Sequence, residues 1–371
     1  MRTLFCCLCT VSLLFVGCST KPGKQVKESV SVQELEPEVV MKVKQLEPLQ
    51  EGTTLLADNI FEEIIHLTGT QKILDGPIFK VTEPEMLIKG DYFLMQNAFS
   101  HDSIFLLFKL PEFEFVKHFG VRGDAPGQFN FPHLAPTTQA DKLAYVYETH
   151  NPQLYSVAYD GTLAHVPMSF PIIKGAVHSN KELYVADSAY YYVDNIRQGK
   201  ALFKSVQYPD SVSLEQMYKL SFSPKHKNWA AYIGDFIVHP SGKRIAYAYK
   251  YFKRFIIYDM ETGASRVVEF DKDGVKEGND IVTLGPDNVT YYWGGSATED
   301  YIYLTYSGRT PIEVSKAKES YIHLEQFDWN GNPVGKYKLD HWGRTIADGQ
   351  NNKLYQLVYT YDDPLFVYDL P

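Results

Sequence analysis

The chain has no cysteine after residue 18. Its four cysteines, Cys6, Cys7, Cys9 and Cys18, all lie within the first eighteen of 371 residues. A disulfide framework is therefore excluded for the rest of the chain, and so are zinc sites built from paired cysteines. A domain exported without disulfides must be held together by core size and strand pairing, which a chain of this length can supply.

Long apolar runs and basic clusters are also missing. The apolar stretch Leu4–Val16 is too short to span a bilayer as a helix, and no run of 18 apolar residues follows it. The formal net charge is -9, with 36 Lys and Arg against 45 Asp and Glu. A surface that binds nucleic acid phosphates needs gathered Lys and Arg, so we expect no nucleic acid partner.

The common motifs of enzymes are absent as well. Gly294–Thr298 lacks the final glycine of a G-x-S-x-G nucleophile elbow, and there is no H-E-x-x-H zinc motif and no phosphate-binding glycine loop. Oxygen ligands gather in Asp271–Asp280, but glycine comes at the fourth place and Val275 occupies a ligand position of an EF-hand. The sequence therefore predicts no catalytic residue and no cofactor, with calcium in this loop as the alternative.

The N-terminus has the three parts of an export signal. Arg2 gives a basic start, Leu4–Val16 forms an apolar core, and the core ends in Leu14–Cys18. This ending resembles the lipobox of bacterial lipoproteins, with Phe15 in a place that Leu usually takes. The resemblance implies a signal peptide over residues 1–17 and acylation of Cys18, which would anchor the chain to a membrane outside the cytoplasm, expected to be the outer membrane. The alternatives are an ordinary cleaved leader with a chance cysteine and a short membrane anchor.

Residues 18–58 read as the lipidated cysteine and a flexible spacer. The stretch is charged, rich in Val and Glu, interrupted by Pro37 and Pro48, and free of aromatic residues. A folded domain is predicted over residues 59–371.

That domain is predicted to be all-β. Tyr and Phe, at 27 and 22 residues, are abundant strand formers. In Ser320–Phe327, Ile322 and Leu324 share one face and His323 and Glu325 the other, as a half-buried strand requires. Similar runs are Ile104–Leu110, Leu143–Glu148, Gln153–Tyr159, Leu183–Asp187, Arg244–Tyr251, Phe255–Asp259, Tyr301–Tyr306 and Leu354–Tyr361.

A strand that ends in an aromatic residue and a polar turn recurs along the domain. The aromatic residue is Phe108, Tyr159, Tyr258, Phe327 or Tyr368, with successive spacings of 51, 99, 69 and 41 residues. One degraded copy in Ala201–Tyr208 would complete a series of six with a period of about 50 residues, which is the size of a propeller blade. The chain ends directly after the last such strand, so an early segment, Gly76–Glu83, is expected to supply the outer strand and close the ring.

A family resemblance agrees with this interpretation. The glycine-rich run Phe119–Phe129, followed by Pro132, resembles the signature of NHL-type propeller repeats. Its place near the start of the domain is similar to that in the TolB-like six-bladed propeller lipoproteins. The resemblance implies a six-bladed ring, in a family largely without assigned function. Together with the N-terminal signal and the expected closing segment, the sequence predicts a six-bladed β-propeller closed by an N-terminal strand and preceded by a lipoprotein signal peptide and spacer.

Aromatic clusters are the best candidates for ligand binding. Tyr191, Tyr292 and Trp293 lie in aromatic triplets, and the glycine pair that follows Trp293 predicts a loop. Rings exposed at a propeller face can stack on a flat or sugar-like ligand, to which Arg122 or Arg254 would add polar contacts. Packing between blades is the alternative interpretation of the same rings, and the more usual place for aromatic residues in strands.

We therefore expect a cell-envelope lipoprotein whose propeller binds or scaffolds a protein partner or small ligand at the face formed by inter-strand loops. The insertion between the fourth and fifth blades, including Pro311–Ser320, is a candidate contact loop. One alternative is a glycan-binding lipoprotein, and another is a propeller hydrolase or lyase with a metal in the central channel. Histidines that could hold such a metal are His118, His133, His150, His178 and His239.

Overall fold

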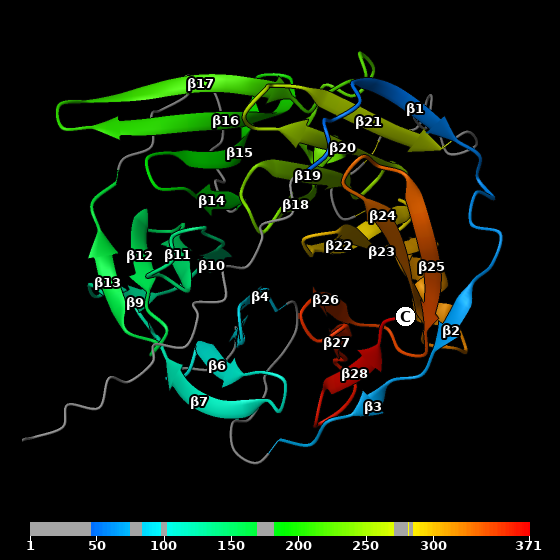
Figure 1. Ribbon diagram of the computed structural model, residues 1–371, viewed down its shortest axis with the longest axis horizontal. Coiled ribbons are helices and arrows are strands. Elements are labelled where there is room, and N and C mark those ends of the chain that lie inside the picture. The colour runs from blue at the N-terminus through cyan, green and yellow to red at the C-terminus, as the bar shows by residue number, and fades with distance from the viewer. Residues whose placement is uncertain (1–45, 75–83, 98–101, 169–181, 271–280, 282–284) are drawn as a thin grey trace, which may run out of the picture. The chain divides into compact units, whose positions relative to one another are not determined.

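The computed structural model describes residues 46–74, 84–97, 102–168, 182–270, 281 and 285–371. They belong to one compact unit that begins at Lys44. Cys18 with its lipobox and the acidic loop Asp271–Asp280 lie outside the described residues, so the predictions made for them stay predictions. The described residues form a six-bladed β-propeller whose sheets surround a central channel (Figure 1). The predicted all-β fold is confirmed.

Each blade is an antiparallel sheet whose first strand is innermost. Blade 1 contains β4 (Met86–Lys89), β5 (Tyr92–Gln96), β6 (Phe105–Lys109) and β7 (Glu114–Phe119). Blade 2 contains β10 (Pro132–Ala135), β11 (Ala144–Glu148), β12 (Gln153–Val157) and β13 (Leu163–Val166). Blade 3 contains β14 (Leu183–Val185), β15 (Tyr190–Ile196), β16 (Gly199–Tyr208) and β17 (Ser211–Lys219).

The other three blades follow the same plan. Blade 4 contains β18 (Gly234–Val238), β19 (Arg244–Tyr249), β20 (Arg254–Asp259) and β21 (Ser265–Phe270). Blade 5 contains β22 (Thr290–Ala297), β23 (Tyr301–Arg309), β24 (Ile322–Asp328) and β25 (Pro333–Leu339). Blade 6 contains β26 (Arg344–Asp348), β27 (Lys353–Leu357) and β28 (Leu365–Asp369).

The repeat found in the sequence marks the third strand of every blade. Phe108, Tyr258, Phe327 and Tyr368 lie in β6, β20, β24 and β28, and Tyr159 lies two residues after the end of β12. The degraded copy, Ala201–Tyr208, lies in β16. The third strand recurs visibly because it is paired on both sides and has both faces against other blades, so it needs large apolar residues and a tight turn after it.

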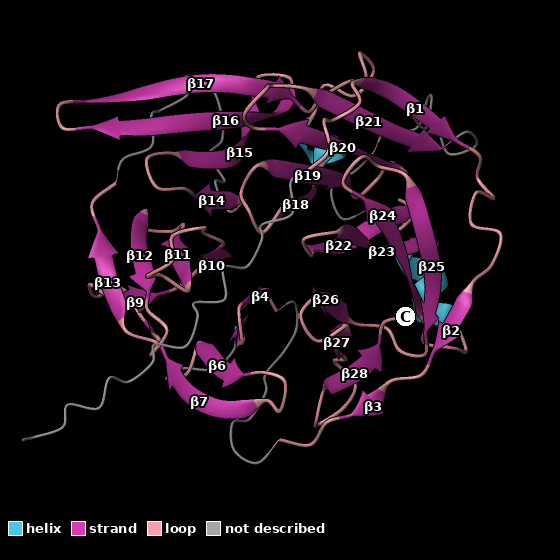
Figure 2. Ribbon diagram, viewed as in Figure 1, coloured by secondary structure: helices cyan, strands magenta, loops and turns pink. Residues whose placement is uncertain are grey.

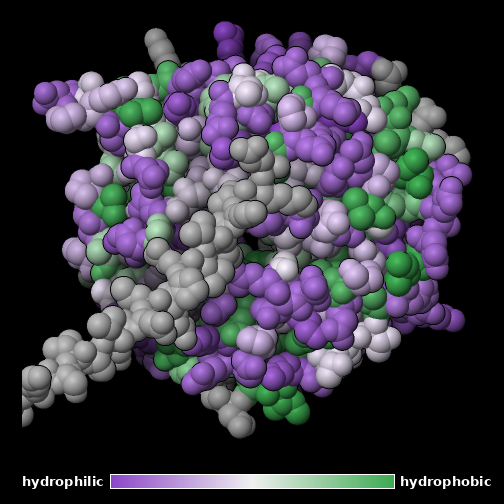
Figure 3. Space-filling model, viewed as in Figure 1, coloured by the Kyte–Doolittle hydropathy of each residue, from purple (hydrophilic) through white to green (hydrophobic). Residues whose placement is uncertain are grey.

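The hydrophobic core lies between blades. Six clusters of buried side chains each join two neighbouring blades, and one of them joins blade 6 to blade 1 through Tyr355 and Phe93. On the face drawn in Figure 3 the surface is mainly hydrophilic, with apolar residues scattered over it. A single blade could not cover its own apolar faces, so the ring is the smallest unit that buries them.

The N-terminal strap, which we define as residues 46–71, runs along the outside of blades 4, 5 and 6 (Figure 1). Its strand β1 (Gly52–Leu56) pairs in parallel with β21, and β2 (Ile65–Leu67) pairs in parallel with β25. The third strand, β3 (Thr70–Gln71), pairs antiparallel with β28 and is the fourth strand of blade 6.

The strap changes two expectations. The predicted closing segment, Gly76–Glu83, lies outside the described residues, and the outer strand of blade 6 comes from β3. The spacer predicted to reach residue 58 is too long, because residues 46–58 already pair and pack with the propeller: Leu49 and Leu56 are buried in the core between blades 4 and 5. A short strand on an outer edge has little apolar patterning of its own, so its sequence resembles a linker.

Helix is almost absent from the described residues (Figure 2). They contain one 3-10 helix, η1 (Trp229–Tyr232), and one α-helix, α1 (Pro311–Lys316), neither long enough nor apolar enough to cross a bilayer. A capping box between Thr310 and Glu313 starts α1, with Pro311 in its first turn. The segment Pro311–Ser320 lies inside blade 5, between β23 and β24. Its predicted place between blades 4 and 5 was therefore wrong.

Candidate functional site

The central channel is the main concave feature of the described residues. The six inner strands β4, β10, β14, β18, β22 and β26 surround it, and it opens into two cavities. The wide mouth, about 620 Å³, lies where the inner strands begin. The narrow mouth, about 420 Å³, lies at the turns that follow them. Both share the lining residues Leu87, Ile88, Pro136, Val238, Ala297 and Ala347, so they are two ends of one channel.

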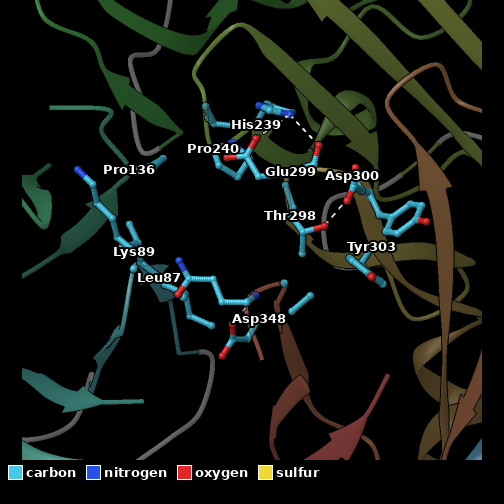
Figure 4. A pocket seen from close by; sticks show the side chains of 18 of the residues that line it. Leu87, Lys89, Pro136, His239, Pro240, Thr298, Glu299, Asp300, Tyr303 and Asp348 are labelled. Carbon is cyan, nitrogen blue, oxygen red and sulfur yellow. Dashed lines mark hydrogen bonds and ion pairs between the residues drawn. The ribbon is translucent and has the colours of Figure 1, made fainter. Parts of the chain in front are cut away.

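The polar side chains of the narrow mouth hold turns together (Figure 4). Lys89 donates to the carbonyl oxygens of Gln139 and Lys142, each at 2.6 Å, and so ties blade 1 to blade 2. Asp348 accepts from the backbone N–H of Gln350 at 3.0 Å and from the hydroxyl of Tyr355 at 3.0 Å. These side chains already form hydrogen bonds within the protein, so they have little capacity left to bind a ligand.

His239 is the buried titratable group of this mouth. Its Nδ1 accepts from the backbone N–H of Ser241 at 2.9 Å, and its Nε2 lies 3.1 Å from the carbonyl oxygen of Glu299. This network assigns the proton to Nε2, which then donates to Glu299. Burial lowers the pKa of His239 to about 4, so the ring is neutral at pH 7.

His239 should make the propeller sensitive to acid. Because its pKa is about 4 in the folded state and about 6.5 in the unfolded chain, the unfolded chain binds the extra proton between these values. Stability should therefore fall as the pH drops from about 6.5 to about 4, by roughly 3 kcal/mol. Urea unfolding across this range should show a shallower pH dependence for His239→Gln than for the wild type; equal slopes would contradict the assignment.

The acidic side chains of blades 1 and 3 at the wide mouth have partners inside the protein. Glu85 lies 2.5 Å from Nδ1 of His133 and accepts from the backbone N–H of Leu134 at 2.6 Å. Glu182 lies 3.6 Å from the buried ammonium of Lys200. The negative charge on this side of the mouth is thus partly neutralised.

Arg344, the first residue of β26, lies on the other side of the wide mouth. Its Nη1 donates to the carbonyl oxygen of Trp293 at 2.6 Å, and its guanidinium lies 4.6 Å from the centre of the Trp293 ring. Asp235, from β18, is 3.6 Å from the same nitrogen. Gly294, which follows Trp293, has φ +150°, and a Cβ there would lie 3.2 Å from Nη1 of Arg344. The glycine therefore leaves room for the guanidinium.

Trp293 belongs to a stack that continues away from the channel. Its ring is stacked on Trp342 with centroids 5.0 Å apart. The guanidinium of Arg309 lies 5.4 Å from the Trp342 ring and 4.2 Å from the Tyr321 ring. We use the name aromatic ladder for five side chains: Arg344, Trp293, Trp342, Arg309 and Tyr321. Stacking of this kind fixes a guanidinium plane and stabilises its charge.

The predicted ligand-binding residues are only partly brought together. Arg122 lines the wide mouth. Trp293 accepts a hydrogen bond from Arg344, which also lines this mouth. Tyr191 stacks on Tyr184 inside blade 3 and is nearly buried. Tyr292 is fully buried and donates to Glu325 at 3.1 Å.

Arg254 also lies away from both mouths. Its guanidinium packs over Phe222 at 4.0 Å and forms an ion pair with Glu269. Sequence reasoning missed Arg344, Asp235 and Phe131, which line the wide mouth. All three lie within two residues of the start of an inner strand. This position could have identified them, but only if the blades were aligned strand by strand.

No group of three or more His, Cys, Asp or Glu that could hold a metal occurs in the part of the chain that the structure describes. The ring of His133 contacts the carboxylate of Glu85, and the ring of His239 forms hydrogen bonds with the backbone of Glu299 and Ser241. The calcium alternative concerned Asp271–Asp280, which the structure does not describe.

Residues 61–348 match the family model described as TolB-like 6-blade propeller-like. The chain belongs to this family. The six blades around one channel are the architecture that the family description states. A search of curated proteins gave no match for this TolB-like propeller.

Solved structures are similar in fold. A member of the duf4221 family from Bacteroides vulgatus is 10% identical, with a TM-score of 0.54, and the match covers 82% of this chain and 98% of that one. A putative exported protein from Bacteroides fragilis is 12% identical, with a TM-score of 0.47 and coverage of 85% and 98%. TolB from Acinetobacter baumannii is 13% identical, with a TM-score of 0.39 and coverage of 76% and 64%. At such identities, only the fold of the first is informative.

Proposed function

We propose that this TolB-like propeller is a ligand-binding module of the bacterial cell envelope, held outside the cytoplasm by lipid on Cys18. The lipobox-like ending Leu14–Cys18 supports the anchor and the location, with the outer membrane as the proposed site. The observation that carries the binding role is the wide mouth, an open cavity of about 620 Å³ lined by all six blades. Small-molecule sites commonly have about 300–1,000 Å³ and lie where several elements converge.

The exposed ring of Phe131 supports the wide mouth over the narrow one. Most aromatic side chains here are buried between blades, but Phe131 is 59% exposed and lines the wide mouth directly before β10. An aromatic ring at the rim of a cavity supplies contact area at little entropic cost, and such residues often dominate binding. The narrow mouth, in contrast, uses its polar groups in turns.

The path of the strap supports the same choice. Glu47 accepts from Arg244, and Leu49 packs in the core with Trp329. Arg244 and Trp329 flank turns on the side of the narrow mouth. The described start of the strap therefore lies on the side of the narrow mouth, and neither Glu47 nor Leu49 lines the wide mouth.

Binding can be tested on the unlipidated chain, residues 19–371. A panel of metabolites, peptides and glycans would be screened by thermal shift, and hits measured by calorimetry. We expect at least one compound to bind, and Phe131→Ala to weaken it by about tenfold, because truncating a ring at a binding rim costs about 1 kcal/mol or more.

Tyr208→Ala is the matched control. Tyr208 is 54% exposed, close to the exposure of Phe131, and lies at the tip of the β16–β17 hairpin outside the channel lining. Its removal should leave affinity unchanged. A panel without hits, or a hit that is equally sensitive to both substitutions, would overturn the wide mouth as the site. A hit restricted to glycans would assign the glycan alternative.

A further inference from the structure

We infer that the wide mouth recognises the head group of an α-amino acid, free or as the C-terminal residue of a peptide. Arg344 would bind its carboxylate, and Asp235 would accept from the adjacent ammonium or amide N–H. This inference rests on the proposed function, because it assigns a ligand class to the same cavity.

The guanidinium of Arg344 has N–H donors that make no hydrogen bond within the described residues. In Arg244, by comparison, all three guanidinium nitrogens donate. Arg244 is 2% exposed and donates to Asp259 at 3.2 Å, to the carbonyl of Trp329 at 3.0 Å and to the carbonyl of Glu47. Arg344 is 22% exposed and, among the described residues, donates one hydrogen bond, to the carbonyl of Trp293. Its Nε has no partner there. A guanidinium carries five N–H donors; with Nε buried and one Nη1 hydrogen used by Trp293, the other donors of the two terminal nitrogens remain for a ligand.

The guanidinium is also held in place before any ligand arrives. One face lies against Trp293, which is itself stacked on Trp342. The hydrogen bond to the Trp293 carbonyl fixes one edge of the guanidinium. Because Gly294 has no side chain, the guanidinium has room to lie there. A preorganised planar fork loses little entropy on binding and matches the two oxygens of a carboxylate.

Asp235 supplies the second half of the recognition. The 3.6 Å between its Oδ1 and Nη1 of Arg344 is too long for a hydrogen bond, so the two charges are neighbours across a gap. In an α-amino acid, the nitrogen and the carboxyl carbon are both bonded to Cα and lie about 2.5 Å apart. Such a head group therefore offers an anion to Arg344 and a donor to Asp235 over a comparable span.

The charges around the mouth favour this ligand over a phosphate. Three carboxylates, Glu85, Glu182 and Asp235, line the cavity with Arg122 and Arg344. Although His133 and Lys200 partly neutralise Glu85 and Glu182, the carboxylates repel a dianion more strongly than a monoanion, and a zwitterion carries no net charge for them to repel. The side chain of the bound residue would meet an apolar wall formed by Met86, Leu183, Phe236, Ile237 and Ile346.

Calorimetry on the chain of residues 19–371 tests the inference with three probes for each L-amino acid: the free acid, its N-acetyl form and its carboxamide. We expect at least one acid or N-acetyl acid to bind and its carboxamide to bind about tenfold or more weaker, since the charge-assisted bonds to Arg344 are lost. Arg344→Gln should weaken the acid to the level of the carboxamide and leave the carboxamide unchanged. Inorganic phosphate should compete poorly.

The acetylated probes identify the source of the head group. Equal or tighter binding of the N-acetyl form indicates a peptide C-terminus, and weaker binding indicates a free amino acid. In either case Asp235→Asn should weaken the preferred probe, which provides a second variant if Arg344→Gln fails to fold. Tyr208→Ala, which removes an exposed ring outside the channel lining, is again the control; it should leave affinity within about twofold.

The outcomes separate this inference from the proposed function. Equal binding of acid and carboxamide, or full affinity in Arg344→Gln, overturns it. If no probe binds but another compound binds in a Phe131-dependent way, the ligand class is wrong and the binding role stands. If nothing binds at the wide mouth, both fail.

Discussion

Deleting residues 19–72 is expected to leave a chain that does not fold stably. The deletion removes the whole strap, and with it Leu49, Leu56 and Phe61 from the core between blades 4 and 5. Fully burying a large apolar side chain contributes about 1.5–3 kcal/mol, so Leu49 and Leu56 contribute roughly 3–6 kcal/mol, to which the partly buried Phe61 adds. The total stability of a domain is about 5–15 kcal/mol. The edges of β21, β25 and β28 would also be exposed to pairing with other chains, so aggregation is expected.

The control for this deletion is a shorter one, of residues 19–43. It ends where the compact unit begins at Lys44 and removes none of the contacts described above. Circular dichroism, gel filtration and urea unfolding of both variants measure the effect. A variant without the strap that unfolds with the same free energy as the shorter deletion would show that the ring closes through its inter-blade cores alone.

Replacing Arg244 by Met is expected to reduce the free energy of unfolding by about 3–5 kcal/mol, because it leaves buried polar groups without their cation. Arg244 joins three parts of the chain: Asp259 in β20, Trp329 after β24 and Glu47 in the strap. Its loss would leave the Asp259 carboxylate and two carbonyls short of a donor. Urea unfolding at pH 7 measures the change.

Two further variants make this test specific. Lys243→Met removes the neighbouring cation, whose pair with Glu261 has both side chains more than half exposed. Surface pairs contribute about 0–1 kcal/mol, so little change is expected. In the double variant Arg244→Met with Asp259→Asn, part of the lost stability should return. A loss in Arg244→Met no larger than in Lys243→Met would contradict the structural role assigned to Arg244.

The blades were predictable because their signals are local. Nine predicted runs coincide with strands, since strand alternation and turn residues act over fewer than ten positions. The third strand of each blade gave the repeat, even in the degraded copy within β16. The six-blade count followed from spacing, which insertions such as α1 stretch but do not erase.

The strap and the wide mouth were not predictable in the same way. β1 has one buried residue in five, because it lies on an outer edge and is held mainly by backbone hydrogen bonds, which any sequence can make. Tyr191 and Tyr292 were expected at a ligand site and lie in blade packing. An aromatic triplet reports a strand without saying which of its faces meets a neighbouring blade.

The amino-acid order was enough for the all-β class and the six repeats, because each depends on residues close together in the chain. The juxtaposition of Arg344 from blade 6, Asp235 from blade 4 and Trp293 from blade 5 arises only when the ring closes. Residues more than a hundred positions apart meet at the channel because the blades pack radially, and no local pattern carries that information.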